Sequence, residues 1–146
     1  MIPPIVSVTR YLVVKQLAGK TSIVMAILDY FEKIESPSSL AKRYGMSKHQ
    51  IRGYVQRIME KCGSFARSRA IVMAIAPLVL RLRPVIYRDG DGSYRCRLCG
   101  DSFVLDDREA HVERIHSDYV DDAIYAVIEK ARSMILNNRK AEVIAR

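Results

Sequence analysis

The spacing of apolar residues predicts helices near both ends of the chain. Between Thr21 and Ile34 apolar residues recur three and four positions apart, which is the period of a helix with one buried face. Thr21 is a suitable N-cap for this helix. The same period runs through residues 118–137, which follow a second candidate cap, Ser117. One face of that final helix would carry Val120, Ile124, Val127, Ile128, Ala131 and Ile135.

Caps and glycines predict further helices between these two. Ser36 and Pro37 form an N-cap followed by proline at the first helical position, and Gly45 supplies the left-handed residue that ends this helix. Ser47 caps the next helix, which extends from Lys48 to about Lys61. The chain is therefore predicted to be mainly helical.

The N-terminal segment, residues 5–17, fits either a short helix or an edge strand. A helix is favoured because Gly19 stands where a helix-ending residue belongs, and Thr9 is a candidate cap. Downstream of residue 93, residues 94–104 predict a short hairpin and residues 105–116 a helix.

The segment after Gly63 is also open to two interpretations. A helix beginning at Ser64 or Ser68 would extend to Leu80 and bend at Pro77. The alternation of apolar and basic residues over 80–83 equally fits a strand.

Residues 38–58 have the pattern of two helices crossing at a tight turn. Ala41 is small where the helices must approach closely, and Gly45 provides the turn. The stretch resembles the DNA-binding helix-turn-helix of prokaryotic-type transcription regulators, and the alternative is a helical hairpin with a solvated basic face. Apolar contacts would come from Leu40, Tyr44, Ile51, Val55 and Ile58. The predicted DNA contacts are Lys42, Arg43, Ser47, Lys48, His49, Gln50, Arg52, Gln56 and Arg57.

Charge places this stretch in the basic part of the molecule. The 146 residues carry 24 Lys and Arg against 16 Asp and Glu, a net charge of +8. Residues 1–90 have a net charge of +10 and residues 91–146 of −2, and residues 36–69 alone reach +7. This distribution favours double-stranded DNA as a partner, with a merely solvated basic surface as the alternative.

A second motif, Cys96-x2-Cys99-x11-His111-x4-His116, offers four ligands at spacings that suit tetrahedral Zn²⁺. The two histidines are five positions apart, so the end of their helix must bend or unwind for both to bind. Residues 94–116 resemble a single Cys2His2 zinc finger, with Tyr94 and Phe103 at its aromatic positions. Two departures from that family are the interval of 11, one short of the usual spacing, and Arg108 in place of the helix leucine, with Leu105 one turn earlier.

The helix of this finger carries acidic residues where a DNA-reading finger contacts bases. By the resemblance these positions hold Val104, Asp107 and Ala110, with Asp106 alongside. The carboxylates would favour the helix N-terminus and repel phosphate, so a structural or protein-contacting role is predicted. DNA reading by the finger, an absent metal and a Cys–Cys disulfide are the alternatives. If the finger is a separate module, chelation unfolds residues 94–116 and leaves the first 60 residues helical.

Together these features predict a helix-turn-helix domain, winged or not, at 1–88, a ββα zinc finger at 89–117, and a C-terminal helix and tail at 118–146. The combination resembles small transcription regulators of archaea and their viruses. It implies sequence-specific DNA binding and a protein partner for the finger or last helix. A homodimer is expected because the motif covers about half a site. Residues 70–80 and 119–135 are the candidate dimer surfaces, and packing of both segments inside one molecule is the alternative. The alternative is an interaction or architectural protein that binds nucleic acid without sequence preference.

Other classes are not expected. The phosphate-loop-like stretch 18–21 lacks its first glycine, and four zinc ligands leave no open catalytic position, so no enzyme is predicted. The longest uncharged apolar run, residues 70–80, is too short to span a membrane and contains Pro77. Without a secretion signal, and with three cysteines of which Cys62 is expected to be buried, an intracellular location is expected.

Overall fold

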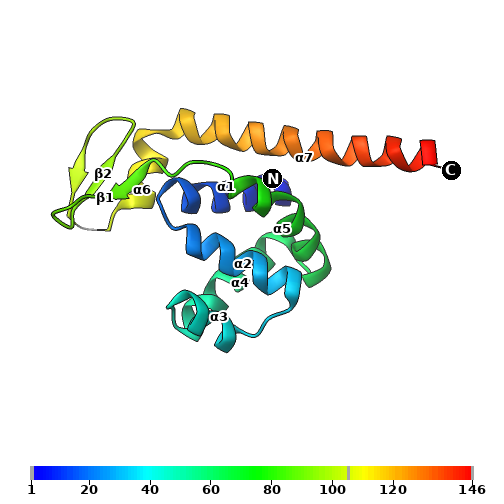
Figure 1. Ribbon diagram of the computed structural model, residues 1–146, viewed down its shortest axis with the longest axis horizontal. Coiled ribbons are helices and arrows are strands. Elements are labelled where there is room, and N and C mark those ends of the chain that lie inside the picture. Colours follow the sequence, from blue (N-terminus) through cyan, green and yellow to red (C-terminus); the bar gives the residue numbers. More distant parts are fainter. Residues whose placement is uncertain (1, 105, 146) are drawn as a thin grey trace.

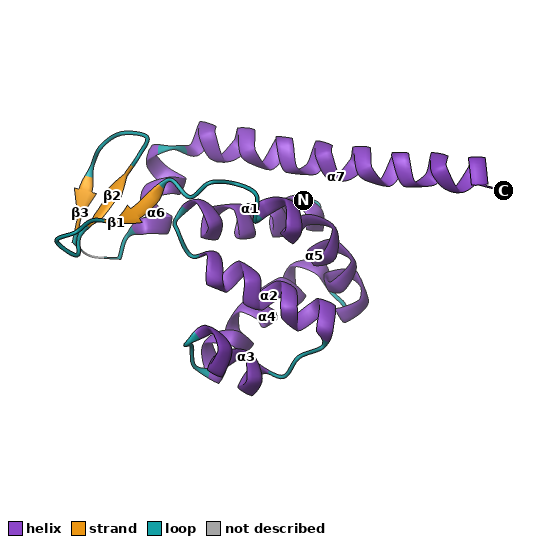
Figure 2. Cartoon of the chain, viewed as in Figure 1, coloured by secondary structure: helices purple, strands orange, loops and turns teal. Residues whose placement is uncertain are grey.

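The computed structural model describes residues 2–104 and 106–145, and over these residues it forms seven helices and one small antiparallel sheet. Five helices make a compact body, the sheet lies at one end, and the last helix runs along the side (Figures 1 and 2). The prediction of a mainly helical chain is confirmed.

Helix α1 (Pro4–Leu17) is the centre of the body. Pro3 is its N-cap and Pro4 its first residue, positions at which the missing N–H of proline leaves no helical hydrogen bond unmade. The edge-strand alternative for this segment is wrong. Thr9 is not a cap either, because it is buried inside the helix and its hydroxyl donates to the carbonyl of Ile5. Residues 12–18 are all buried, and α2, α4, α5, α6 and α7 all pack against α1.

Four further helices complete the body: α2 (Thr21–Lys33), α3 (Pro37–Tyr44), α4 (Lys48–Cys62) and α5 (Phe65–Val79). Helix α3 packs against α2 and α4, and the other three pack against α1. The serine caps formed as predicted, with Ser36, Ser47 and Ser64 each accepting a backbone N–H from the first turn. The predicted Thr21 cap is wrong, because Thr21 is the first residue inside α2 and Lys20 is its N-cap.

The end of α5 agrees with the helix interpretation of this segment and not with the strand interpretation of residues 80–83. Pro77 lies inside the last turn of the helix, and a turn follows at residues 80–82, so the strand alternative is wrong. Cys62 is buried at the end of α4, as predicted. No single helix in the described part of the chain is long and apolar enough to cross a membrane; α4 and α5 reach that length and composition only as a pair bent by 103°.

The sheet has the order β1-β2-β3 and is antiparallel, with β1 (Ile86–Arg88), β2 (Tyr94–Cys96) and β3 (Ser102–Phe103). The predicted hairpin of β2 and β3 is therefore present, but a third strand precedes it. Within residues 2–88 the structure has no hairpin that could form a wing, because β1 pairs with β2 across the turn at 88–93.

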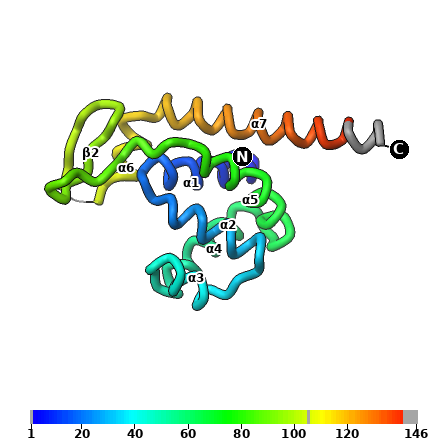
Figure 3. The backbone as a smooth tube through the Cα atoms, viewed as in Figure 1, coloured from blue at the N-terminus to red at the C-terminus, as the bar shows by residue number. Residues whose placement is uncertain are grey.

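Helix α6 (Arg108–Ile115) follows the sheet, and α7 (Ser117–Ala145) completes the chain. Leu105, which the sequence placed at the start of a helix, lies outside the described residues. Helix α7 is longer than predicted, and it lies beside α1 before extending past the body (Figure 3). Val120, Ile124, Val127 and Ala131 are buried as expected, whereas Ile135 is 47% exposed.

Candidate functional site

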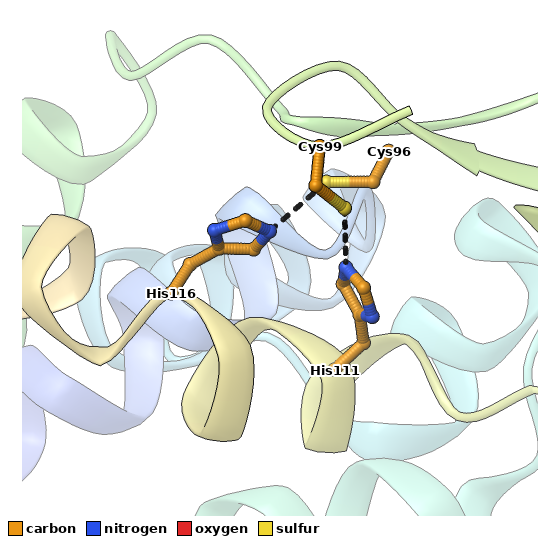
Figure 4. A group of neighbouring side chains, drawn as sticks. All are labelled: Cys96, Cys99, His111 and His116. Carbon is orange, nitrogen blue, oxygen red and sulfur yellow. Dashed lines mark hydrogen bonds between the residues drawn. The ribbon is translucent and has the colours of Figure 1, made fainter. Parts of the chain in front are cut away.

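The Cys/His motif forms a compact cluster. Cys96, Cys99, His111 and His116 present ligand atoms that all lie within 4.8 Å of one another (Figure 4). The Sγ of Cys96 is 3.4 Å from Nε2 of His116, and the Sγ of Cys99 is 3.5 Å from Nε2 of His111. Two thiols and two imidazoles facing one point are a donor set that can hold a metal ion.

The backbone between the two cysteines turns tightly. The N–H of Gly100 donates to the carbonyl of Cys96, and the N–H of Cys96 donates to the carbonyl of Asp101. Gly100 has a φ of 79°, which a glycine adopts without strain. This turn directs both thiols to the same side of the sheet, toward α6.

The two histidines reach the cluster because α6 ends between them. His111 lies within the helix, whereas His116 follows its last residue and has a non-helical φ of −120°. The end of the helix therefore departs from helical geometry as the five-residue spacing predicted. The ring of Phe103 stacks on His111 with centroids 5.2 Å apart, which fixes the imidazole orientation. Burial, together with the neighbouring His111, lowers the pKa of His116 and favours the neutral, ligating form.

The segment that holds this cluster is attached to the helical body by partly buried ion pairs. We call residues 86–116, from β1 to the last histidine, the Cys/His segment. The Nζ of Lys15 is 2.8 Å, and that of Lys20 2.6 Å, from the carboxylate of Glu109 on α6. The Lys15 side chain is only 9% exposed. Burial raises the pKa of Glu109, but hydrogen bonds from the two lysines outweigh it and the pKa is lowered overall.

The acidic residues before α6 differ from their predicted role at the helix N-terminus. Asp106 pairs with Arg108 at 2.8 Å and lies 3.7 Å from the Nζ of Lys20. The Arg108 hydrogen bond is the main reason that the pKa of Asp106 falls to about 2. Asp107 is the N-cap, yet its side chain makes no capping hydrogen bond. The guanidinium of Arg108 lies over the ring of Tyr94, 4.5 Å from its centroid.

Backbone contacts tighten the same junction. The N–H of Val85 donates to the carbonyl of Leu17 at 2.9 Å, and the N–H of Arg97 donates to the carbonyl of Val85 at 2.8 Å. A side chain at Gly19 would place its Cβ 2.7 Å from the carbonyl oxygen of Ile86. Only glycine permits this approach, so the end of α1 is fitted to β1.

The other predicted site is the surface of α3 and α4, which we call the helix pair. Leu40, Ile51, Val55 and Ile58 are buried, and Tyr44 is half-buried, so the apolar contacts predicted from the sequence are present. The connection between the helices, residues 45–47, has Gly45 in the left-handed conformation with a φ of 66°. The polar residues predicted to contact DNA are all exposed on the outside of this pair.

Four of these predicted contacts are engaged within the protein. Ser47 and Gln50 form a capping box, each side chain bonding the backbone N–H of the other. Arg43 pairs with Asp29 at 3.0 Å and with Glu35 at 2.6 Å. The amide of Gln56 donates to Glu60 on the same helix.

The remaining five predicted contacts are cationic or imidazole groups. Arg57 lies beside Tyr11, which raises the pKa of this arginine. Lys42, Lys48, His49 and Arg52 have no ion-pair or side-chain hydrogen-bond partner among the residues that the structure describes. Their donors face solvent at the turn and along the first half of α4.

One arrangement could not be predicted from the spacing of residues. A cleft of about 360 Å³ separates the start of α4 from the start of α6. Gln50 and Tyr54 line it on one side, and Lys20, Asp106 and Arg108 on the other. The cleft brings the Cys/His segment next to the helix pair, although some 50 residues separate them in the chain.

Comparisons with known proteins give no family: no family model, no curated protein and no solved structure matches this chain. Its function is therefore inferred from its own residues.

Proposed function

We propose that this protein is a sequence-specific DNA-binding transcription regulator. The helix pair would act as a helix-turn-helix, with α4 in the major groove and lysines and arginines neutralising phosphates. Zn²⁺ in the Cys/His cluster would have a structural role. A homodimer is part of the proposal, because one helix-turn-helix covers half a site, and so is an intracellular location.

The observation that carries this proposal is the difference between free and paired cations. Lys15, Lys20 and Arg108 are paired with carboxylates at the junction with α6. Lys48 and Arg52, on the exposed side of α4, have no such partner among the described residues. Cations that gather on one helix surface without nearby carboxylates form a positive patch, which favours binding to phosphates.

The four ligands support Zn²⁺ as the metal, because thiolate and imidazole together favour zinc over calcium or magnesium. When bound, zinc would cross-link β2, the turn after it and α6. All four coordination positions would be filled by protein, which supports a structural rather than a catalytic ion. The ligands of the proposed site are Cys96, Cys99, His111 and His116.

The second candidate, an architectural protein that binds nucleic acid without sequence preference, has one observation in its favour. Gln50 and Gln56 are the two predicted contacts whose side-chain amides could read adenine, and both amides are already hydrogen-bonded at or within α4. The free groups that remain are mostly cations, which contact phosphates of any sequence.

A binding experiment separates the two candidates. Duplexes enriched by repeated selection and duplexes of random sequence would be titrated with the zinc-loaded protein at fixed salt. We expect the selected sites to bind about 10³-fold more tightly. A ratio near one would overturn the regulator and leave the architectural protein.

Substitutions on the helix pair test which residues read the sequence. Arg52→Ala should weaken binding to the selected site by about 1–3 kcal/mol and change the random duplex less, whereas Lys42→Ala should weaken both equally. Arg114→Ala, an exposed arginine on α6, is the matched control and should leave affinity unchanged. Equal losses on both DNAs for Arg52→Ala would show that α4 does not read bases.

A further inference from the structure

Helix α7 has an outer face that the body does not cover. Val120, Ile124, Val127 and Ala131 are buried against α1 and α5, so the opposite side of the helix faces solvent. Positions three and four apart form one stripe on that side. Tyr125 is 70% and Leu136 50% exposed on this stripe, among the more exposed apolar side chains of the protein. Its six members are Asp122, Tyr125, Glu129, Arg132, Leu136 and Arg139.

The charges of the stripe are complementary to those of a second copy that runs in the opposite direction. Along the chain it is acidic, aromatic, acidic, basic, aliphatic and basic. If a second α7 lies antiparallel to the first, Asp122 faces Arg139, Tyr125 faces Leu136, and Glu129 faces Arg132 of the other copy. Each of these contacts occurs twice because the arrangement has a two-fold axis. Asp121 and Lys140, which border the stripe, also face each other in this register.

We propose that this face binds a second copy of the same chain, with the two α7 helices antiparallel. The paired stretch, residues 122–139, is about 27 Å long at the rise of an α-helix. The order of charges on this stripe is complementary to the same stripe in the opposite direction, which favours a second copy as the partner.

A groove beside the stripe supports this register. It has a volume of about 280 Å³ and is lined by Ile5 from α1, Ala74 from α5, and Ile128, Ile135 and Leu136 from α7. Leu136 is the residue that faces Tyr125 of the other copy, so the tyrosine ring would enter this groove. Two tyrosines and two grooves would then be filled in one dimer, which removes the most exposed apolar group of the face from water.

The charges of the stripe have few competing partners. Arg132 lies 3.3 Å from Glu129 on the same helix, so the two-fold axis would join two such pairs into a cluster of four alternating charges. Asp121 is paired with Arg10 at 2.6 Å, and Lys140 of the second copy would approach a carboxylate that already holds one cation. Asp122 and Arg139 make no ion pair within the described residues and carry the clearest complementarity.

The inference supplies the contact for the homodimer proposed above and rests on that dimer, not on DNA binding. It is tested without DNA, by sedimentation equilibrium of the full zinc-loaded chain over a range of concentrations. We expect a monomer–dimer equilibrium that weakens as salt rises. Asp122→Arg and Arg139→Asp should each weaken the dimer by about tenfold or more, because each variant places like charges opposite one another twice.

Mixing these two variants gives the decisive measurement. In a mixed dimer Arg at 122 of one copy faces Asp at 139 of the other, and the two unchanged residues also form an opposite-charge pair. The mixture should therefore form heterodimers with about the affinity of the unaltered protein, detected by native mass spectrometry. Tyr125→Ala should weaken the dimer without charge change, and Lys130→Asp, exposed on another side of α7, should not.

Three results would overturn the inference. The unaltered chain could remain monomeric at several hundred micromolar, Asp122→Arg could leave the dimer intact, or the mixed variants could fail to pair. Circular dichroism and thermal unfolding exclude misfolding as the cause, since every altered side chain is exposed. A monomer that still binds a selected DNA site would overturn this inference and leave the DNA-binding proposal standing.

Discussion

The helix pair and the Cys/His segment use their charged residues in opposite ways. On the helix pair, Lys48 and Arg52 face solvent without partners among the described residues. In the Cys/His segment, Asp106 and Glu109 are held by lysines of the first helix and the next turn. Of the two aspartates predicted to repel DNA, Asp106 lies 3.7 Å from Lys20 and so helps attach the segment to the basic half, whereas Asp107 stays exposed.

The ion pairs to the lysines make the Cys/His segment less independent of the helical body than a separate zinc finger would be. A zinc finger is expected to fold as a separate unit around its metal. Here Cys96 and Val112 belong to the same cluster of buried apolar residues as α1 and α5, and Lys15 is buried with Glu109 as its ion-pair partner. The Cys/His cluster and the helical body therefore share one core.

Removing the metal is the change from which we expect the largest effect on the fold. Zinc-finger peptides gain on the order of 10 kcal/mol from their metal, so chelation should unfold the Cys/His segment. Because the core is shared, we expect helicity in the first 60 residues to be lost in the same thermal transition at lower temperature, and hydrogen exchange of α1 to accelerate. The sequence alone favoured a separable finger. Two well-separated transitions, with α1 still protected, would restore that simpler interpretation.

The ion pair between Lys15 and Glu109 tests the attachment of the Cys/His segment at a single residue. Glu109→Gln would leave Lys15 buried without a carboxylate, which should lower the free energy of unfolding by about 3 kcal/mol. Denaturant titration of the zinc-loaded protein measures this. Asp107→Asn is the matched control, since Asp107 is exposed on the same helix and makes no capping bond, and it should cost under about 0.5 kcal/mol. Equal small effects would mean that the ion pairs do not attach the segment.

Two glycines test the backbone contact between the regions. Gly19 and Gly45 both have positive φ, 85° and 66°, so alanine at either position is strained by about 1–2 kcal/mol. At Gly19 the added Cβ would also lie 2.7 Å from the Ile86 carbonyl, whereas nothing lies within 4 Å at Gly45. Gly19→Ala should therefore destabilise the protein by about 1 kcal/mol more than Gly45→Ala. Identical unfolding midpoints would show that β1 can move away from α1.

The local elements followed from the sequence because their causes are local. Serine caps before α3, α4 and α5, the glycine after α3 and the ligand spacing all act within a few residues. The third strand was missed because β1 is short and obtains its hydrogen bonds from β2, across a turn that looked like a domain boundary. The contact between Lys15 and Glu109 was missed because the two residues are 94 positions apart, and no local pattern pairs a lysine of one helix with a glutamate of another.

The sequence also does not show which predicted DNA contacts are bonded to other residues of the protein. Gln50 is a predicted DNA contact because it lies in the first turn of α4. Its position there, N3, is also the one that completes a capping box with Ser47. Arg43 is among the predicted DNA contacts, although it pairs with Asp29 of α2 and with Glu35 in the connection between α2 and α3. Sequence identifies which residues are charged; packing decides which of them remain free.

Lowering the pH should have the smallest effect on the contacts that attach the Cys/His segment to the helical body. Asp106 has a pKa of about 2, below its ordinary value of 3.8, mainly because Arg108 bonds the charged form. A lowered pKa stabilises the fold above the ordinary value, and that contribution is lost as the pH falls from about 4 toward 2. Because Asp106 is about half exposed, Asp106→Asn should cost under about 1 kcal/mol at pH 6, and the difference from the unaltered protein should vanish near pH 2. Protonation of the cysteines and histidines releases the metal in the same pH range, so metal occupancy is measured alongside each unfolding curve and the two proteins are compared at equal occupancy. A difference that stays constant from pH 6 to pH 2 would show that Asp106 acts through packing and not through its charge.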